Sequence, residues 1–151
     1  MPKPRLAGAT GVLVLDTHVW IWMLEGTKGQ LSGATVTLVE QAAGRAEVAV
    51  AAISVWEVAM LAAKNRITVS RSIDEWTAAA LAAPGIRLVE LTPEIALEST
   101  RRPGEVHGDP ADRLIIATAR VLGATLITCD DRILDYASGG HVRVRNGRSR
   151  T

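Results

Sequence analysis

The chain has 151 residues, 48% of them hydrophobic and 22% charged, with a formal net charge of +1. That length can bury one sizeable core but is short for two, so we expect a single domain. No apolar run approaches the roughly 20 residues of a membrane-spanning helix, and we expect a cytoplasmic protein with no membrane partner.

Cysteine and histidine are too few for several kinds of site. Cys129 has no second cysteine with which to form an internal disulfide, and the histidines are His18, His107 and His141. These residues lack the spacing of zinc ligands. Any metal ion must therefore be held by oxygen ligands.

Basic residues are concentrated at the C-terminal end. Residues 141–151 contain four arginines and no acid, whereas residues 1–140 contain 13 basic and 16 acidic residues, a net charge of −3. Such a distribution is compatible with nucleic-acid binding, although a short charged terminus is also typical of a solvated tail. We predict a flexible leader at residues 1–11, a folded domain at 12–145 and a basic tail at 146–151.

Apolar runs of strand length alternate with helical patterns along the chain. In chain order, we expect a strand at residues 12–15, helices at 17–25 and 32–44, a strand at about 47–53, and helices beginning at Ser54 and Ser72. There follow a strand at 86–91, a helix from Thr92, a loop at 101–108, a helix at 109–122, a strand at 125–128, a short helix at 131–137 and a fifth strand at 142–144. This alternation predicts a single α/β domain whose parallel sheet is flanked by helices on both faces.

Four acids stand where this fold would bring them together. Asp16 follows the first strand, Glu57 lies in the first turn after the second, Asp112 begins a helix, and Asp130 follows the fourth strand. In open α/β sheets the ligand crevice lies at the carboxyl ends of the strands. Crowded carboxylates repel one another unless a cation neutralises them, and oxygen ligands suit Mg²⁺ or Mn²⁺. A metal-activated water could then hydrolyse a phosphodiester.

Each acid also has a purely structural explanation. Glu57 could complete a capping box with Ser54, and Asp109 is expected to cap the helix that follows it and do little else. Asp112 could complement the positive end of its helix, and Asp16 and Asp130 could be cap or turn residues. No acid is specific when taken alone.

Four segments together resemble a known family. They are Val14-Leu15-Asp16-Thr17-His18, Ile53-Ser54-Val55-Trp56-Glu57-Val58, the stretch from His107 to Ala119 around Asp112, and Leu126-Ile127-Thr128-Cys129-Asp130. Their order and spacing over about residues 12–137 are similar to those of VapC-type PIN domains, the toxin ribonucleases of toxin-antitoxin pairs. The resemblance implies a PIN domain at residues 12–145 that cleaves RNA with Mg²⁺ or Mn²⁺. It also implies a small antitoxin partner and a homodimer.

By the same resemblance, Asp16, Glu57, Asp112 and Asp130 occupy the positions of the family's metal-binding acids. Neighbouring polar residues are secondary candidates: Thr17, Ser54 and Thr128, which could orient a carboxylate or water, and Arg113, which could bind phosphate or form a structural ion pair. We expect the C-terminal arginines to help capture RNA.

Other interpretations remain open. A receiver domain would need an acidic pair after the first strand, where this chain has Asp16-Thr17-His18. A PIN domain could instead act in RNA maturation, or only bind. The tryptophans are expected to pack in the core or an interface rather than stack on bases, and Trp20, Trp22 and residues 54–65 form a candidate antitoxin-binding patch.

Overall fold

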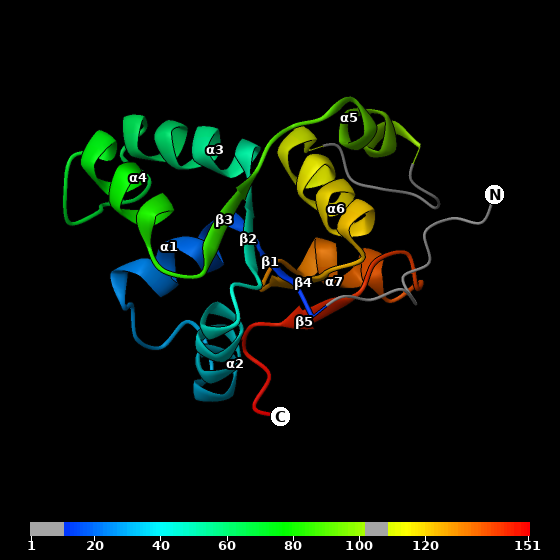
Figure 1. Ribbon diagram of the computed structural model, residues 1–151, viewed down its shortest axis with the longest axis horizontal. Coiled ribbons are helices and arrows are strands. Elements are labelled where there is room, and N and C mark those ends of the chain that lie inside the picture. The colour runs from blue at the N-terminus through cyan, green and yellow to red at the C-terminus, as the bar shows by residue number, and fades with distance from the viewer. Residues whose placement is uncertain (1–10, 102–108) are drawn as a thin grey trace.

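The computed structural model describes residues 11–101 and 109–151, in which five short strands pair into one parallel sheet (Figure 1). The strands are β1 (Leu13–Leu15), β2 (Val48–Ala51), β3 (Ile86–Val89), β4 (Thr125–Thr128) and β5 (Val144–Asn146), in the spatial order β3-β2-β1-β4-β5. In register, Leu13 lies beside Val48 on one side and Thr125 on the other. The predicted leader, except Gly11, and most of the predicted loop lie outside the described residues.

The helices follow the predicted order. They are α1 (Thr17–Glu25), α2 (Gly33–Gly44), α3 (Ala52–Ala63), α4 (Ile73–Ala82), α5 (Pro93–Thr100), α6 (Pro110–Leu122) and α7 (Asp131–Ala137). Ser72 and Thr92 cap α4 and α5 as predicted, by accepting hydrogen bonds from the backbone amides of Glu75 and Ile95. No helix in the described parts of the chain is both long enough and apolar enough to cross a membrane.

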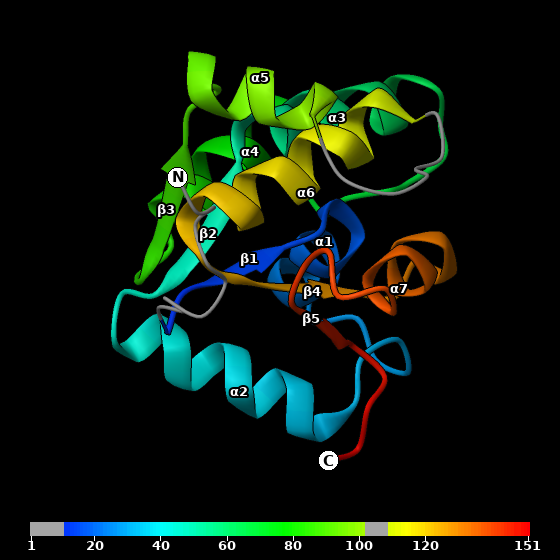
Figure 2. The same ribbon diagram turned by 90° about the vertical axis from the view of Figure 1, so that its right-hand side faces the viewer.

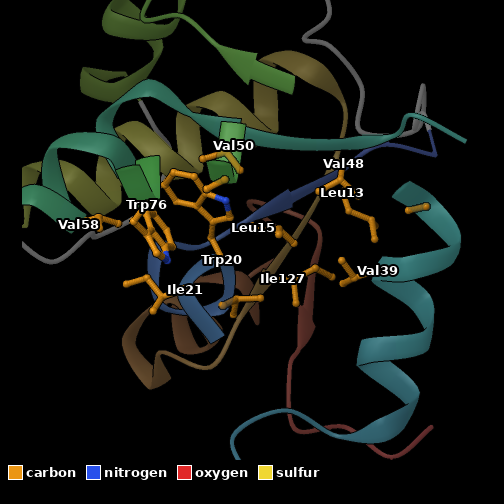
Figure 3. Packing of buried hydrophobic residues seen from close by; sticks show 13 residues of the cluster. Leu13, Leu15, Trp20, Ile21, Val39, Val48, Val50, Val58, Trp76 and Ile127 are labelled. Atoms are coloured by element: carbon orange, nitrogen blue, oxygen red, sulfur yellow. The ribbon is translucent and has the colours of Figure 1, made fainter. Parts of the chain in front are cut away.

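Side chains alternate across the central strands and form a hydrophobic core on each face. On one face, Leu13 and Leu15 pack with α1, α2, α3 and α4 around Trp20 (Figure 3). On the other face, Val12 and Val14 pack against α6 and α7. The central strands β1, β2 and β4 are therefore buried on both faces, which explains their apolar sequence. The arrangement confirms the predicted sheet between helical layers.

Three predicted strand ranges were wrong, one of which, expected at residues 86–91, ends at Val89. The strand expected at residues 47–53 ends at Ala51, and α3 begins at Ala52 with no side-chain cap, so Ser54 lies inside the helix rather than capping it. The fifth strand lies at Val144–Asn146 instead of residues 142–144. Its pairing with β4 sets this register, because Leu126 lies beside Val144 and Thr128 beside Asn146.

Gly85 provides a test of how closely α2 and the turn before β3 are packed. Its φ of +81° is strained for any other residue, and a Cβ there would overlap the backbone carbonyl of Ala43. Gly85→Ala should therefore lower the free energy of unfolding by about 2–4 kcal/mol, measured by urea denaturation. Gly44→Ala is the matched control, since a Cβ there meets nothing within 4 Å. Equal stability of the two variants would contradict this packing.

Candidate active site

The four predicted acids line one cleft at the carboxyl end of the sheet. Asp16 follows β1, Asp130 follows β4, Glu57 lies in α3 and Asp112 lies in the first turn of α6. All four contribute to the lining of a hollow of about 510 Å³. The spatial order of the strands reverses between β1 and β4, so Asp16 and Asp130 flank the point where a parallel sheet opens a crevice.

Asp16 is held in place by hydrogen bonds to both of its carboxylate oxygens. Oδ1 accepts the backbone N–H of Thr17 at 2.8 Å, which caps α1, and Oδ2 accepts the Thr128 hydroxyl at 2.7 Å. The Thr128 hydroxyl in turn accepts the backbone N–H of Asp130 at 3.0 Å. Thr128, the last residue of β4, therefore links the acids that follow the two central strands.

Glu57 is oriented by a second pair of hydroxyl groups. The Thr17 hydroxyl lies 2.5 Å from Glu57 Oε1 and 2.9 Å from the hydroxyl of Ser54, which is fully buried. A hydroxyl has one proton, so Thr17 can donate to ionised Glu57 while it accepts from Ser54. Ser54 and Glu57 are three residues apart on one helical face, and this shared contact with Thr17 replaces the capping box expected from their spacing.

Asp109 is a site residue that the sequence reasoning missed. It caps α6 as predicted, with Oδ1 accepting the backbone amides of Ala111 at 2.9 Å and Asp112 at 3.3 Å. It also lines the cleft, and one oxygen each of Glu57, Asp109 and Asp112 lie within 4.8 Å of one another. The three-residue interval between Asp109 and Asp112 in a first helical turn was the available signal.

The secondary candidates have different positions. Thr17 lines the cleft, Thr128 is buried and donates to Asp16, and Ser54 is buried and contacts the Thr17 hydroxyl that holds Glu57. Arg113 is half-buried and is not among the described residues that line the cleft. Its role in phosphate binding stays a prediction, as does the assignment of the acids to metal binding.

The remaining lining of the cleft combines aromatic, apolar and basic side chains. His18 and Trp22 form a ring pair whose centroids are 5.8 Å apart. The other described lining residues are Met60, Leu61, Arg66, Cys129, Arg132 and Arg148. Trp20, in contrast, is fully buried and meets Trp76 edge to face at 5.0 Å, so its predicted place in an antitoxin-binding patch was wrong.

Burial and mutual repulsion make this cleft unfavourable for so many negative charges. Burial raises the pKa of Asp112 to about 8, and repulsion from the other four acids of the cleft adds to the effect. Burial likewise raises the pKa of Asp16 and of Glu57, against the opposing effect of hydrogen bonds from Thr128 and Thr17. Asp112 therefore carries a proton at neutral pH unless a cation replaces it.

The donor set fits a hard divalent cation. Glu57, Asp109 and Asp112 offer only carboxylate oxygens, which suit Mg²⁺ or Mn²⁺. An ion at this position would offset the repulsion that now falls mainly on Asp112. The arrangement can thus concentrate positive charge at a point where the strand ends leave room for a ligand.

The raised pKa of Asp112 predicts that the metal-free protein loses stability as pH rises. Between the ordinary value of 3.8 and about 8, the folded chain holds a proton on this group that the unfolded chain has released. The free energy of unfolding must then fall with increasing pH across that window. In EDTA at pH 8, Asp112→Asn should melt at least about 2 °C above the wild type, the shift that about 1 kcal/mol gives in a domain of this size.

Asp135→Asn is the matched control for this melting experiment, because Asp135 is exposed on α7 and outside the cleft. Thermal melts between pH 5 and 8, followed by circular dichroism, measure the effect. If the difference in melting temperature between wild type and Asp112→Asn is the same at every pH in that range, the raised pKa of Asp112 is excluded as a source of instability.

Comparison with known proteins agrees with this architecture. Residues 13–139 match the family model described as the PIN domain. The chain is 39% identical over 124 residues to Ribonuclease VapC22 of Mycobacterium tuberculosis (strain ATCC 25618 / H37Rv), a match that covers 82% of this chain and 91% of that relative.

Solved structures share the fold at lower identity. VapBC2 from Rickettsia felis, bound to a promoter DNA fragment, matches with a TM-score of 0.61 and 12% identity over 89% of this chain and 98% of that chain. DNA-bound VapBC from Salmonella typhimurium matches with a TM-score of 0.63 and 14% identity over 89% and 96% of the two chains. These two likenesses concern the fold alone. Because the family model covers most of its length, the chain belongs to the PIN domain family.

Proposed function

We propose that this PIN domain is a Mg²⁺- or Mn²⁺-dependent endoribonuclease that hydrolyses phosphodiester bonds in cytoplasmic RNA. The observation that carries the proposal is the gathering of five carboxylates in one cleft, with Glu57, Asp109 and Asp112 close enough to share an ion. The similarity to Ribonuclease VapC22, which extends over 91% of that relative, supports the same reaction.

The acids of the cleft have distinct tasks in this mechanism. Glu57, Asp109 and Asp112 would hold the ion, with Asp16 and Asp130 completing the acidic lining. A bound Mg²⁺ or Mn²⁺ supplies a more acidic water and offsets negative charge on the scissile phosphate.

Hydrogen bonds within the cleft prepare the carboxylates for this chemistry. The Thr128 hydroxyl and the Thr17 backbone amide hold the two oxygens of Asp16, and the Thr17 side chain holds Glu57. Fixed rotamers reduce the rearrangement needed when a ligand arrives. Asp112 must release its proton before it can act as an anionic ligand, so ion binding and proton release are coupled.

Loss of either of two central carboxylates should abolish the reaction. Asp16→Asn and Asp112→Asn remove a negative charge with little change in shape, and each should lower RNA cleavage at least about 100-fold, since even outer partners of a metal site contribute about 10- to 100-fold. Cleavage of total RNA with Mg²⁺ or Mn²⁺, and its loss in EDTA, provide the measurement. Asp135→Asn should cleave as the wild type does. Folded Asp16→Asn or Asp112→Asn with full activity would exclude that residue from the mechanism.

We further propose that the enzyme is the toxin of a toxin-antitoxin pair, binds a small antitoxin protein and forms a homodimer. Large apolar side chains are exposed in the described part of the chain, with Trp56 at 55%, Leu91 at 52% and Leu97 at 48%. These are the described apolar side chains that a protein–protein contact would bury. The names of the solved relatives, which are toxin-antitoxin complexes, support such a partner.

Co-expression tests the antitoxin proposal directly. The small protein encoded beside this chain should copurify with it and relieve growth inhibition, because occupation of the cleft blocks cleavage. The non-cleaving Asp16→Asn variant is the control, since it should copurify without causing toxicity. A wild-type chain that inhibits growth equally with and without the neighbouring protein, and never copurifies with it, would argue for a role in RNA maturation instead.

A further inference from the structure

The four C-terminal arginines do not form one basic tail. Arg145 is committed to the fold, because its side chain donates to the Thr35 hydroxyl at 3.0 Å and to the backbone carbonyls of Ser149 and Thr151 at 3.1 and 3.3 Å. Arg143 has a buried Nη1 atom. Arg148 and Arg150, in contrast, are exposed and line hollows of the surface.

Arg148 and Arg150 line a second hollow of about 490 Å³ together with residues 29–34, and we call it the basic pocket. None of the described residues that line it is acidic. Within the described residues, neither arginine forms an ion pair, although the Arg148 side chain donates to the Cys129 carbonyl at 3.4 Å. Arg148 also lines the acidic cleft, so the two hollows meet at its side chain.

The segment that carries these arginines is fixed relative to the acids. The amide of Gly147 donates to the Thr128 carbonyl at 2.9 Å, and its carbonyl accepts the amide of Ser32 at 3.0 Å. The Ser32 hydroxyl donates to the Ser149 carbonyl at 2.5 Å. Figure 2 shows the C-terminal end lying beside the start of α2. Thr128 thus connects Asp16 on one side with the arginine-bearing segment on the other.

Close packing at Gly147 strengthens this anchoring. A Cβ at that position would lie 2.7 Å from Cys129 Sγ and 2.8 Å from Leu31 Cδ2. The absence of a side chain lets the segment pass between the end of β4 and the loop before α2. Arg148 is therefore placed by the fold at the rim of the acidic cleft, rather than by the average position of a solvated tail.

The two hollows have opposite electrostatic character. The acidic cleft repels a polyanion, whereas the basic pocket presents two guanidinium groups that can each form paired hydrogen bonds with phosphate oxygens. Residues Gly33 and Ala34, the first of α2, line the same pocket and add the positive end of a helix. A backbone phosphate is the chemical group that suits this combination.

We propose that the basic pocket binds a backbone phosphate of the RNA, next to the phosphate that lies at the acidic cleft. This assignment rests on the proposed ribonuclease function and deepens it. In this arrangement Arg148 and Arg150 contribute affinity for the RNA backbone, and the acids of the cleft carry out the hydrolysis. Arg145, expected from sequence to capture RNA, serves the fold instead, and the same expectation for Arg143 stays a prediction.

Binding of a short fluorescein-labelled oligouridylate tests the pocket independently of cleavage. In an Asp16→Asn background, Arg148→Ala/Arg150→Ala should weaken binding about 10- to 100-fold and reduce the slope of log affinity against log salt by about 0.7, as expected for one lost phosphate contact on a single strand. The matched control is Arg45→Ala/Arg87→Ala, which removes two exposed arginines away from both hollows. Arg148→Lys/Arg150→Lys should keep the salt slope, because the charges remain.

Neutral linkages locate the phosphate along the RNA. In an RNA that the wild type cuts at one site, single methylphosphonates should weaken binding at one linkage near that site, and Arg148→Ala/Arg150→Ala should remove this sensitivity. Unchanged affinity and salt slope in Arg148→Ala/Arg150→Ala would refute phosphate binding by the basic pocket, as would an equal loss of affinity in the Arg45→Ala/Arg87→Ala control. So would intact RNA binding with loss of the antitoxin complex, which would assign the pocket to an acidic peptide. Wild type that binds through the pocket but cleaves no RNA would instead refute the ribonuclease function.

Discussion

Repulsion among buried carboxylates is the constraint around which this molecule is organised. Five acids share one cleft, where burial raises the pKa of Asp16, of Glu57 and of Asp112, the last to about 8. Isolated acids would avoid such a place, or turn outward to water. Here Asp16 and Glu57 are instead held inward by threonine hydroxyl groups. The fold thus maintains an unfavourable charge distribution that a divalent cation can relieve.

The same side chains also satisfy the backbone, which is why their local and functional interpretations do not exclude each other. Asp16, Asp109 and Asp130 each cap a helix by accepting backbone amides. A helix start directs its free N–H groups toward the capping carboxylate and favours negative charge there. Capping therefore contributes stability that partly offsets the repulsion. Capping also fixes these carboxylates near the ends of the strands, so the same residues both begin helices and form the site.

Much of this arrangement follows from sequence, because strand and helix patterns are local. The buried runs, the order of the elements and the convergence of Asp16, Glu57, Asp112 and Asp130 were predictable from apolar runs and from the positions of acids after them. The misses concern contacts between distant segments. Ser54 was predicted to cap a helix because its hydrogen bond to Thr17, 37 residues away, cannot be inferred from the neighbouring sequence. Trp20 was assigned to a partner-binding patch because the sequence of its own helix does not indicate that Trp76, in a distant helix, packs against it.

The roles of the C-terminal arginines also could not be predicted from the sequence alone. Composition places four positive charges within eleven residues, but hydrogen bonds to Thr35 and to carbonyl groups make Arg145 a structural residue. Only the fold of the last strand against β4 and the loop before α2 distinguishes it from Arg148. A guanidinium whose N–H groups are already bonded inside the fold has fewer donors left for phosphate oxygens, whereas Arg148, at the rim of the acidic cleft, presents its donors outward. An enzyme that must hold RNA beside a cluster of carboxylates therefore needs its cations fixed near that cluster, and anchoring of the C-terminal segment through Gly147 and Ser32 provides that position.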